Sequence, residues 1–215
     1  MSFEIFDYRT TNRNVLVTPE IRARLYHMEP GQVDGRHSHD LGHEVFLILE
    51  GRAAFEIAGE TRELGPGQLC IARADEIHQV RNLLPDKPTI MYLSVTPHIQ
   101  PTHTGRNQDG SKEPPRVRPN SVYDVEGDPS IATEMLAEHF LEALQSLAQV
   151  VGASLNVQQE QVTAFKQAVT NGDTHSAMRA RDRMWEALYP LFKQMSVLGA
   201  AWNALTARTA ESESA

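Results

Sequence analysis

The clearest feature of the hydrophobic pattern is a run of apolar residues, VFLIL, from Val45 to Leu49. The run is continuous rather than alternating, which is typical of a strand that is buried on both faces. One face can point into the interior of a barrel. The other face must be covered, either by helices from the C-terminal part of the chain or by a second subunit. The run therefore predicts a central strand and a partner for its outer surface.

Short strands are predicted on both sides of this run. Glycine and proline separate many of them, as at Gly59, at Gly65-Pro66-Gly67 and at Pro85-Asp86. Many short strands with such turns indicate a β-sandwich or a β-barrel. The expected strands are Val15–Val17, Ile21–Met28, Ala53–Ile57, Leu69–Ala72, Gln79–Leu83 and Ile90–Val95.

The segment Ile21–Met28 alternates between apolar and polar residues, so that Arg22 and Arg24 share one face with Tyr26. Two interpretations of these arginines stay open. They can form a solvated strand face, or one of them can lie inside the barrel and bind a substrate carboxylate through two parallel hydrogen bonds.

The stretch 97–130 differs in composition, because it holds six of the 12 prolines. A connection of this length without regular structure is usually a lid, a wrapping arm or a disordered linker. His98 and His103 lie in it. Both can be ordinary surface histidines, or one of them can reach over the mouth of the barrel.

The remainder of the chain has helical spacing of apolar residues. Asp128-Pro129 resembles a helix start, and Gly152 and Pro190 are expected to interrupt the helices. These signals predict four helical segments, at about 131–151, 157–170, 174–190 and 191–207. The expected domains are a β-barrel at 1–97, a proline-rich linker or lid at 98–130, a helical extension at 131–208 and a tail at 209–215.

The composition limits the classes of partner that the protein is expected to bind. The net charge of −8 argues against nucleic acid and against an anionic membrane surface. Cys70 is the only cysteine, so no intrachain disulfide can form and a reducing compartment, the cytoplasm, is expected. Its place in a predicted strand favours a buried, unreactive thiol. No apolar run approaches the length of a membrane span.

Candidate chemistry gathers between Gly31 and Gly51. His37 and His39 are two residues apart, so their imidazoles leave the same face of an extended chain. Glu44 follows after Asp40-Leu41-Gly42, a turn that can reset the alternation. His78 is a candidate for a third imidazole. Imidazoles with one carboxylate suit a divalent transition metal that keeps open positions, and His43 is expected outside the set because it alternates with Glu44.

These residues carry a resemblance to the cupin superfamily. The spacing Gly31-x5-His37-x-His39-x4-Glu44-x6-Gly51 matches the first cupin motif at each defined position. The second motif is similar to Gly59-x5-Gly65-Pro66-Gly67 followed by His78-x3-Asn82. Gly65 and Arg73 stand where the family often has proline, both at turns. The resemblance covers roughly residues 20–97.

The resemblance implies a mainly β fold with an α extension: a jelly-roll β-barrel followed by a C-terminal helical segment. It implies one metal, held by His37, His39, Glu44 and His78, with Fe, Mn, Ni, Co, Cu or Zn as candidates. The expected function is a metal-dependent enzyme of the dioxygenase type acting on a small molecule, with isomerase and lyase as further expected reaction types. The alternative is a non-catalytic metal-binding or small-ligand sensor.

Two further expectations concern the surroundings of the metal. An enzyme needs a polar group near the open positions, for which Tyr26, Tyr92, Arg22 and Arg24 are candidates. The exposed outer face of Val45–Leu49 would favour association, so a homodimer through the barrel sheets, with contacts added by the helices, is expected.

Overall fold

The computed structural model describes residues 3–212. Two compact units can be distinguished: one contains the chain up to Asp128 together with the end of the last helix from Thr206, and the other contains Pro129–Leu205. The strands of the first unit are β1 (Arg13–Val17), β2 (Arg22–Met28), β3 (His37–His39), β4 (His43–Glu50), β5 (Ala53–Ile57), β6 (Glu60–Leu64), β7 (Leu69–Ala72), β8 (His78–Asn82), β9 (Thr89–Thr96) and β10 (His103–Gly105).

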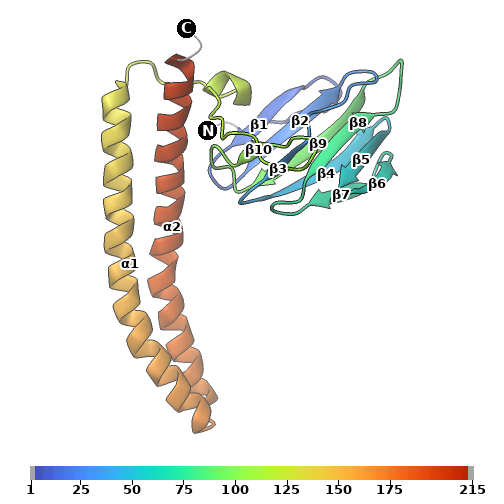
Figure 1. Cartoon of the computed structure of the whole chain (residues 1–215). Coiled ribbons are helices and arrows are strands. Elements are labelled where there is room, and N and C mark those ends of the chain that lie inside the picture. The colour runs from blue at the N-terminus through green and yellow to red at the C-terminus, as the bar shows by residue number, and fades with distance from the viewer. Residues whose placement is uncertain (1–2, 213–215) are drawn as a thin grey trace. The chain divides into compact units, whose positions relative to one another are not determined.

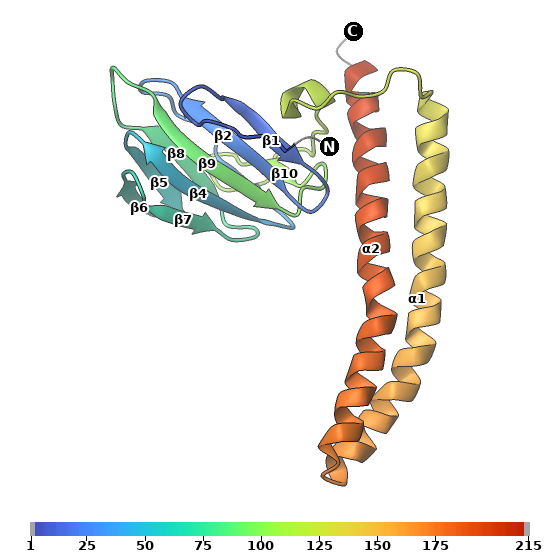
Figure 2. The ribbon, with the colours of Figure 1, turned by 180° about the vertical axis from the view of Figure 1, so that it is seen from behind.

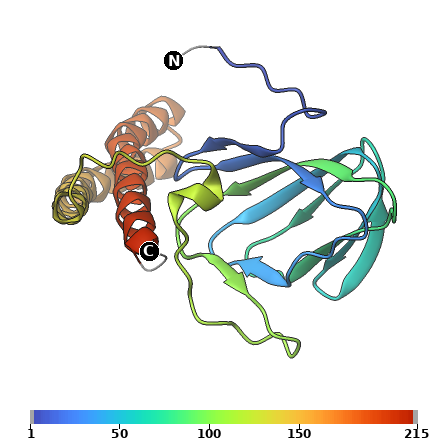
Figure 3. The ribbon, with the colours of Figure 1, turned by 90° about the horizontal axis from the view of Figure 1, so that it is seen from above.

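These strands form two antiparallel sheets of five strands each (Figure 1). The orders are β1-β2-β9-β4-β7 and β10-β3-β8-β5-β6. The view from above shows the two sheets as separate layers that enclose a common interior (Figure 3). This arrangement is consistent with the jelly-roll expected from the sequence.

The interior has an apolar end and a polar end, because the inward-facing positions change character along each strand. Along β4 the buried residues run from Glu44 to Phe46 and Ile48. The same change occurs along β2, from Arg22 to Met28, which is fully buried. The apolar end is the hydrophobic core, formed by Met28, Phe46, Ile48, Ala53, Phe55, Leu64, Ala72, Val80, Met91 and Leu93. This core adjoins the polar end, because the same strands contribute residues to both.

The outer face of β4 is less buried than its continuous apolar sequence predicts. Val45 and Leu47 point outward and are only half-buried. They pair directly with Ile71 and Leu69 of β7, which are 50% and 53% exposed. The apolar run therefore alternates in burial although it does not alternate in composition. Figure 2 shows this sheet from the side opposite to Figure 1.

Two strands of the barrel were not expected. Edge strand β6 reads ETREL and is exposed at each residue except Leu64, so no apolar alternation marks it. Strand β10 lies beyond residue 97, in the proline-rich stretch that was expected to be a linker or lid, and it pairs with β3. The stretch also contains a short 3-10 helix, η1 (Asn120–Tyr123).

The helical segment consists of two long helices rather than four shorter ones: α1 (Thr133–Thr170) and α2 (Thr174–Ser212). The expected start at Asp128-Pro129 is wrong, because α1 begins after its N-cap Ala132. Gly152 does not end α1, since one glycine costs a helix only about 1 kcal/mol. Pro190 lies inside α2, where neighbouring turns keep the helix continuous. Residues 213–215 of the expected tail lie outside the described residues.

Neither long helix has a stretch apolar enough to cross a bilayer, within the residues that the structure describes.

Candidate functional site

The polar end of the barrel brings together the four residues that the sequence singled out. His37 and His39 flank Ser38 on β3, and His78 begins β8 directly opposite His37. Glu44 comes from β4 of the facing sheet. The bend at residues 40–41 carries the chain from one sheet to the other. Because the chain changes sheets at this bend, Glu44 faces the histidines across the interior of the barrel.

The donor atoms converge on one carboxylate oxygen. Glu44 Oε2 lies 2.9 Å from His39 Nε2 and 2.9 Å from His78 Nε2. His37 Nε2 is 3.5 Å from the same oxygen. One ligand atom from each of the four residues lies within 4.8 Å of the others. Glu44, His39 and His78 are at most 3% exposed, so water cannot surround them.

The other ring nitrogens reveal why a cation suits this cluster. His37 Nδ1 lies 2.9 Å from the carbonyl oxygen of Gly35, and His78 Nδ1 lies 2.8 Å from that of Glu76. A carbonyl oxygen can only accept, so Nδ1 must donate in both rings. In a neutral imidazole Nε2 then carries a lone pair, which here points at a carboxylate oxygen. A ring nitrogen and a carboxylate oxygen that face one another as acceptors need a proton or a cation between them, and the type and spacing of these donor atoms fit a metal.

The charge states of the cluster agree with this fit. Burial alone would raise the pKa of Glu44, but the interactions of its carboxylate with the three histidines hold that pKa well below its usual range. Burial lowers the pKa of His39, and the neighbouring His37 and His78 lower it further. The cluster thus favours an ionised Glu44 beside a neutral His39, the protonation states in which both can bind a metal. At His37 burial opposes protonation, but the hydrogen bond and the charge of Glu44 outweigh it and raise the pKa of that ring.

Arg22 lies inside the barrel, which is the location that the second of its two sequence-based interpretations gave it. Its side chain is 11% exposed, and Nη2 lies 3.7 Å from Glu44 Oε1. Arg24, two residues further along the same face, places its guanidinium 4.4 Å from the centre of the Tyr26 ring. The solvated strand face that was the other interpretation is wrong for Arg22.

His103 and His98 also reach this end of the barrel. The His103 ring stacks on that of His37, with 4.2 Å between the ring centres. His98 is 8% exposed, and its pKa falls to about 4 because of burial and the positive charge of Arg22. Both histidines lie in a stretch without hydrophobic periodicity. Their residue type was therefore the one sequence signal that could have indicated a place at the site.

Three other candidates lie elsewhere. His43 is exposed, and its Nδ1 accepts a hydrogen bond from the backbone of Ala74. The Tyr26 hydroxyl donates to Asp34, and burial raises its pKa to about 12. Tyr92 lies between Met91 and Leu93, which belong to the core, so its side chain is on the opposite, outer face of β9. Neither tyrosine is among the residues that line the cavity beside the cluster.

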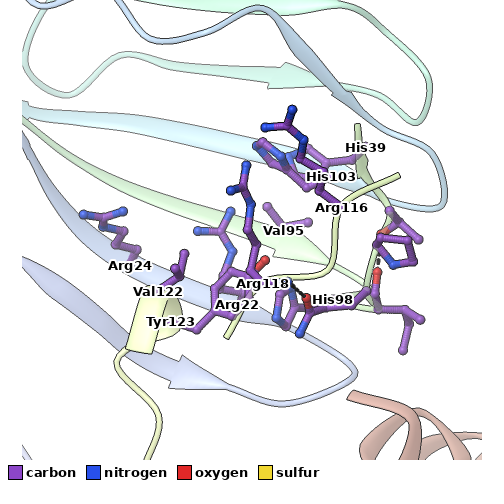
Figure 4. Close-up of a pocket in the computed structure, with 14 residues that line it drawn as sticks. Arg22, Arg24, His39, Val95, His98, His103, Arg116, Arg118, Val122 and Tyr123 are labelled. Carbon is purple, nitrogen blue, oxygen red and sulfur yellow. Dashed lines mark hydrogen bonds between the residues drawn. The ribbon is translucent and has the colours of Figure 1, made fainter. Parts of the chain in front are cut away.

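A cavity of about 230 Å³ opens beside His39 (Figure 4). Arginines enter it from β2 and from the segment after β10, and Tyr123 enters from η1. Its lining consists of Arg22, Arg24, His39, Val95, His98, Ile99, Gln100, Pro101, Thr102, His103, Arg116, Arg118, Val122 and Tyr123. The lining combines positive charge with an apolar wall next to the candidate metal centre.

Solved structures with limited similarity include a Klebsiella pneumoniae protein with a double-stranded beta-helix domain and TT1209 from Thermus thermophilus. The first is 24% identical, with a TM-score of 0.40, and the match covers 45% of this chain and 91% of that one. The second is 26% identical, with a TM-score of 0.41, over 44% and 98%. A salicylate 1,2-dioxygenase variant from Pseudoaminobacter salicylatoxidans is 18% identical, with a TM-score of 0.34, over 37% and 23%. No curated protein sequence matches the chain.

The model of the cupin domain family matches residues 24–95. This range begins in β2 and ends in β9, so it contains the four clustered side chains. The β-domain of this chain belongs to the cupin superfamily.

Proposed function

We propose that the cupin domain binds one divalent transition metal through His37, His39, Glu44 and His78, and that the protein is a metal-dependent, dioxygenase-type oxidoreductase acting on a small molecule. The observation that supports this most directly is the arrangement of acceptors. His37 and His78 each donate a hydrogen bond from Nδ1 to a backbone carbonyl oxygen, and the Nε2 atom of each ring faces Glu44.

The donor set leaves the metal identity open. Three imidazole nitrogens and one carboxylate oxygen suit Fe, Mn, Ni, Co, Cu or Zn, and availability decides among them. When bound, such an ion would supply a Lewis acid with positions left open for a small molecule and for O₂. The single cysteine makes the cytoplasm the expected compartment.

The chain's own residues would hold and orient the reactants. The backbone carbonyls of Gly35 and Glu76 fix the rings of His37 and His78. Arg22 lies on the other side of the Glu44 carboxylate, where its positive charge favours the ionised form. The cavity beside His39 would take the substrate and restrict the access of water.

A non-catalytic sensor is the second candidate. It is favoured by the second compact unit, Pro129–Leu205, which consists of long helices that could pass on a binding event. Fold alone does not separate the two functions, since one scaffold hosts both. Turnover separates them.

The test begins with metal analysis of protein purified without chelators. One metal per chain is expected in the natural protein and in His43→Ala, whereas His39→Ala should lose it. The protein is then stripped, reloaded separately with each candidate metal and assayed for O₂ consumption against a panel of small organic acids. Full metal content in His39→Ala would overturn the site. Stoichiometric metal with no O₂ consumption for any metal or substrate would favour the sensor.

A further inference from the structure

We infer that the cavity beside the metal centre binds a small organic carboxylate, held by Arg24 and Arg118 with its apolar part against Val95 and Val122. This inference rests on the proposed function for the role of the bound molecule as substrate. The binding itself can be measured without any turnover.

The charge around the cavity is one-sided. Arginines 22, 24, 116 and 118 line it together with three histidines, and no aspartate or glutamate is among the described lining residues. Arg22 has a carboxylate neighbour, Glu44, at 3.7 Å. Several guanidinium groups around one small volume repel one another, so an anion entering it would be stabilised.

Arg24 gives a second, independent indication. Its Nε is buried and has no hydrogen-bond partner among the described residues. A buried donor without a partner costs about 1–3 kcal/mol, and a bound water, ion or ligand at Nε would remove that cost. A guanidinium presents a planar fork of N–H donors that matches a carboxylate.

The remainder of the lining indicates what the carboxylate is attached to. Val95, Ile99, Pro101 and Val122 contribute apolar surface, and the Tyr123 ring closes one side. The cavity volume of about 230 Å³ lies slightly below the roughly 300–1,000 Å³ of typical small-molecule sites. The cavity therefore fits a single small ring or a short chain rather than a nucleotide. An organic carboxylate can pair with the arginines and pack against the apolar wall, whereas inorganic phosphate can only pair with the arginines.

Benzoate is a suitable probe, with benzamide as its uncharged counterpart and inorganic phosphate as an anion without an apolar body. Calorimetric titration of the metal-loaded protein should give benzoate an affinity at least tenfold higher than that of benzamide or of phosphate. Arg24→Gln and Arg118→Gln should each weaken benzoate binding tenfold or more. Arg62→Gln is the control, because Arg62 is exposed on β6, does not line this cavity and pairs with Glu60. Circular dichroism and metal content confirm that each variant is folded.

The outcomes separate this inference from the proposed function. Benzoate binding no tighter than benzamide, or unchanged in both arginine variants, overturns the carboxylate site even if metal and O₂ consumption are found. Equal affinity for phosphate overturns the organic part of the inference. Benzoate binding that depends on Arg24 in a protein without metal would support the site while the proposed enzyme fails.

A separate observation concerns the helical unit, whose large apolar side chains face outward. The positions of α1 that are buried are Leu136, Ala143, Ser154, Gln161 and Ala168, mostly small or polar. In α2 they include Ala177 and Ala180. Larger residues are 37–57% exposed: Leu141, Leu144, Val151, Leu155, Phe165 and Val169 on α1, and Met178, Trp185, Tyr189, Phe192 and Met195 on α2.

Most of these exposed residues lie on one side of the helix pair, whereas Met135 on α1 and Val197 on α2, which are exposed to a similar extent, lie outside that side. In α1 they fall one position after the buried row, as Leu144 follows Ala143 and Leu155 follows Ser154. In α2 Met178 likewise follows Ala177. One residue further along an α-helix is a rotation of about 100° around its axis. Because the two helices run in opposite directions (Figure 1), this rotation brings the exposed row of α1 and the exposed row of α2 to the same side of the pair. The pair therefore presents one broad apolar face, as a helix of a bundle does.

We propose that a second copy of the chain covers this face, forming a four-helix bundle. Half-exposed side chains of this size would together bury on the order of 800 Å² per copy, the share that one partner contributes to a stable interface. An identical copy supplies a face of equal length and equal pattern. The homodimer expected from the sequence would then form through the helices rather than through the barrel sheets.

Sedimentation of the full chain tests this. The natural protein should be a dimer, and Leu155→Glu should be a monomer with unchanged helix content and metal content. Gln149→Glu, on the other side of α1, should remain a dimer. A monomeric natural protein overturns the proposal. So does a dimer that survives Leu155→Glu but dissociates in Ile71→Glu, because the interface would then be the outer face of the barrel.

Discussion

His103 of β10 lies directly opposite His39 of β3, and the centres of their rings are 5.0 Å apart. The strand that carries His103 thus extends the sheet that supplies three of the candidate ligands. His103 also stacks on His37 but is not part of the four-residue cluster. It is placed to hold the His37 ring rather than to bind the metal itself.

We therefore expect His103→Ala to keep one metal per chain while the affinity falls by up to about tenfold, as for other residues that orient a ligand. Competition with a chelator of known affinity measures the change. His103→Phe preserves the stacking and should recover most of the affinity. Loss of stoichiometric metal in His103→Phe would mean that the imidazole itself is a ligand.

Gly42 lies between two candidate ligands without being one, in the bend that joins the two sheets. A Cβ there would come within 2.7 Å of the carbonyl oxygen of Thr96 and within 2.9 Å of its carbon. Both atoms are backbone and cannot rotate away. We expect Gly42→Ala to lower the free energy of unfolding by about 1–3 kcal/mol, as overpacking does, and to weaken metal binding by displacing Glu44.

Gly35→Ala is the matched control, because an added Cβ there meets nothing within 4 Å. It lies in the same motif, next to the strand that carries His37. Chemical denaturation and chelator competition measure both variants. Equal behaviour of the two would show that the bend does not determine the position of Glu44.

The sequence predicted the strands best where inward residues are apolar or metal-binding. Glu44 and the histidines could be grouped because a motif spacing brings them together whatever the sheet topology. The sequence also predicted a turn at Asp40-Leu41-Gly42, but not that this turn carries the chain into the other sheet. His103 could not be predicted as a neighbour of His37, since that contact depends on pairing between β10 and β3.

The helical segment was predicted, but the number of helices and their ends were wrong for a different reason. Gly152 and Pro190 carry local signals for helix ends, and local propensity is outweighed when many neighbouring turns continue the helix. The interpretation of Val45 and Leu47 as buried rested on composition alone. Composition does not reveal whether an outward-facing apolar residue has a cover, so the expected partner of that face stays a prediction.

Asn82 stabilises the end of the barrel remote from the metal centre. Its buried amide donates to the carbonyl oxygens of Met28, Glu29 and Lys87, and its Oδ1 accepts from Thr89 Oγ1 and from the backbone of Leu84. Removing the amide leaves buried groups without partners, at about 1–3 kcal/mol each.

We expect Asn82→Ala to lower the free energy of unfolding by about 2–4 kcal/mol without changing metal stoichiometry. Urea denaturation followed by fluorescence provides the measurement. Thr61→Ala, an exposed position on β6, should change stability little. Loss of metal from folded Asn82→Ala would assign Asn82 a role at the site as well.

Cys70 provides a test of pH dependence. Burial first, and the charge of Glu44 second, raise the pKa of its thiol to about 12. The folded protein thus holds this proton more tightly than the unfolded chain does. The resulting stability is present below the unfolded pKa of about 8.5 and is lost as pH rises toward 12.

The same shift predicts slow alkylation. At pH 8.5 the folded protein should contain roughly a thousandfold less Cys70 thiolate than the unfolded chain, because only the unfolded thiol keeps its ordinary pKa. Iodoacetamide should therefore label the native protein at least a hundredfold more slowly than the same protein in urea. Since Cys70 is the only cysteine, the mass of the intact protein reports this one reaction. Labelling at similar rates in both states would show that the thiol is neither buried enough nor close enough to Glu44 for its pKa to be raised.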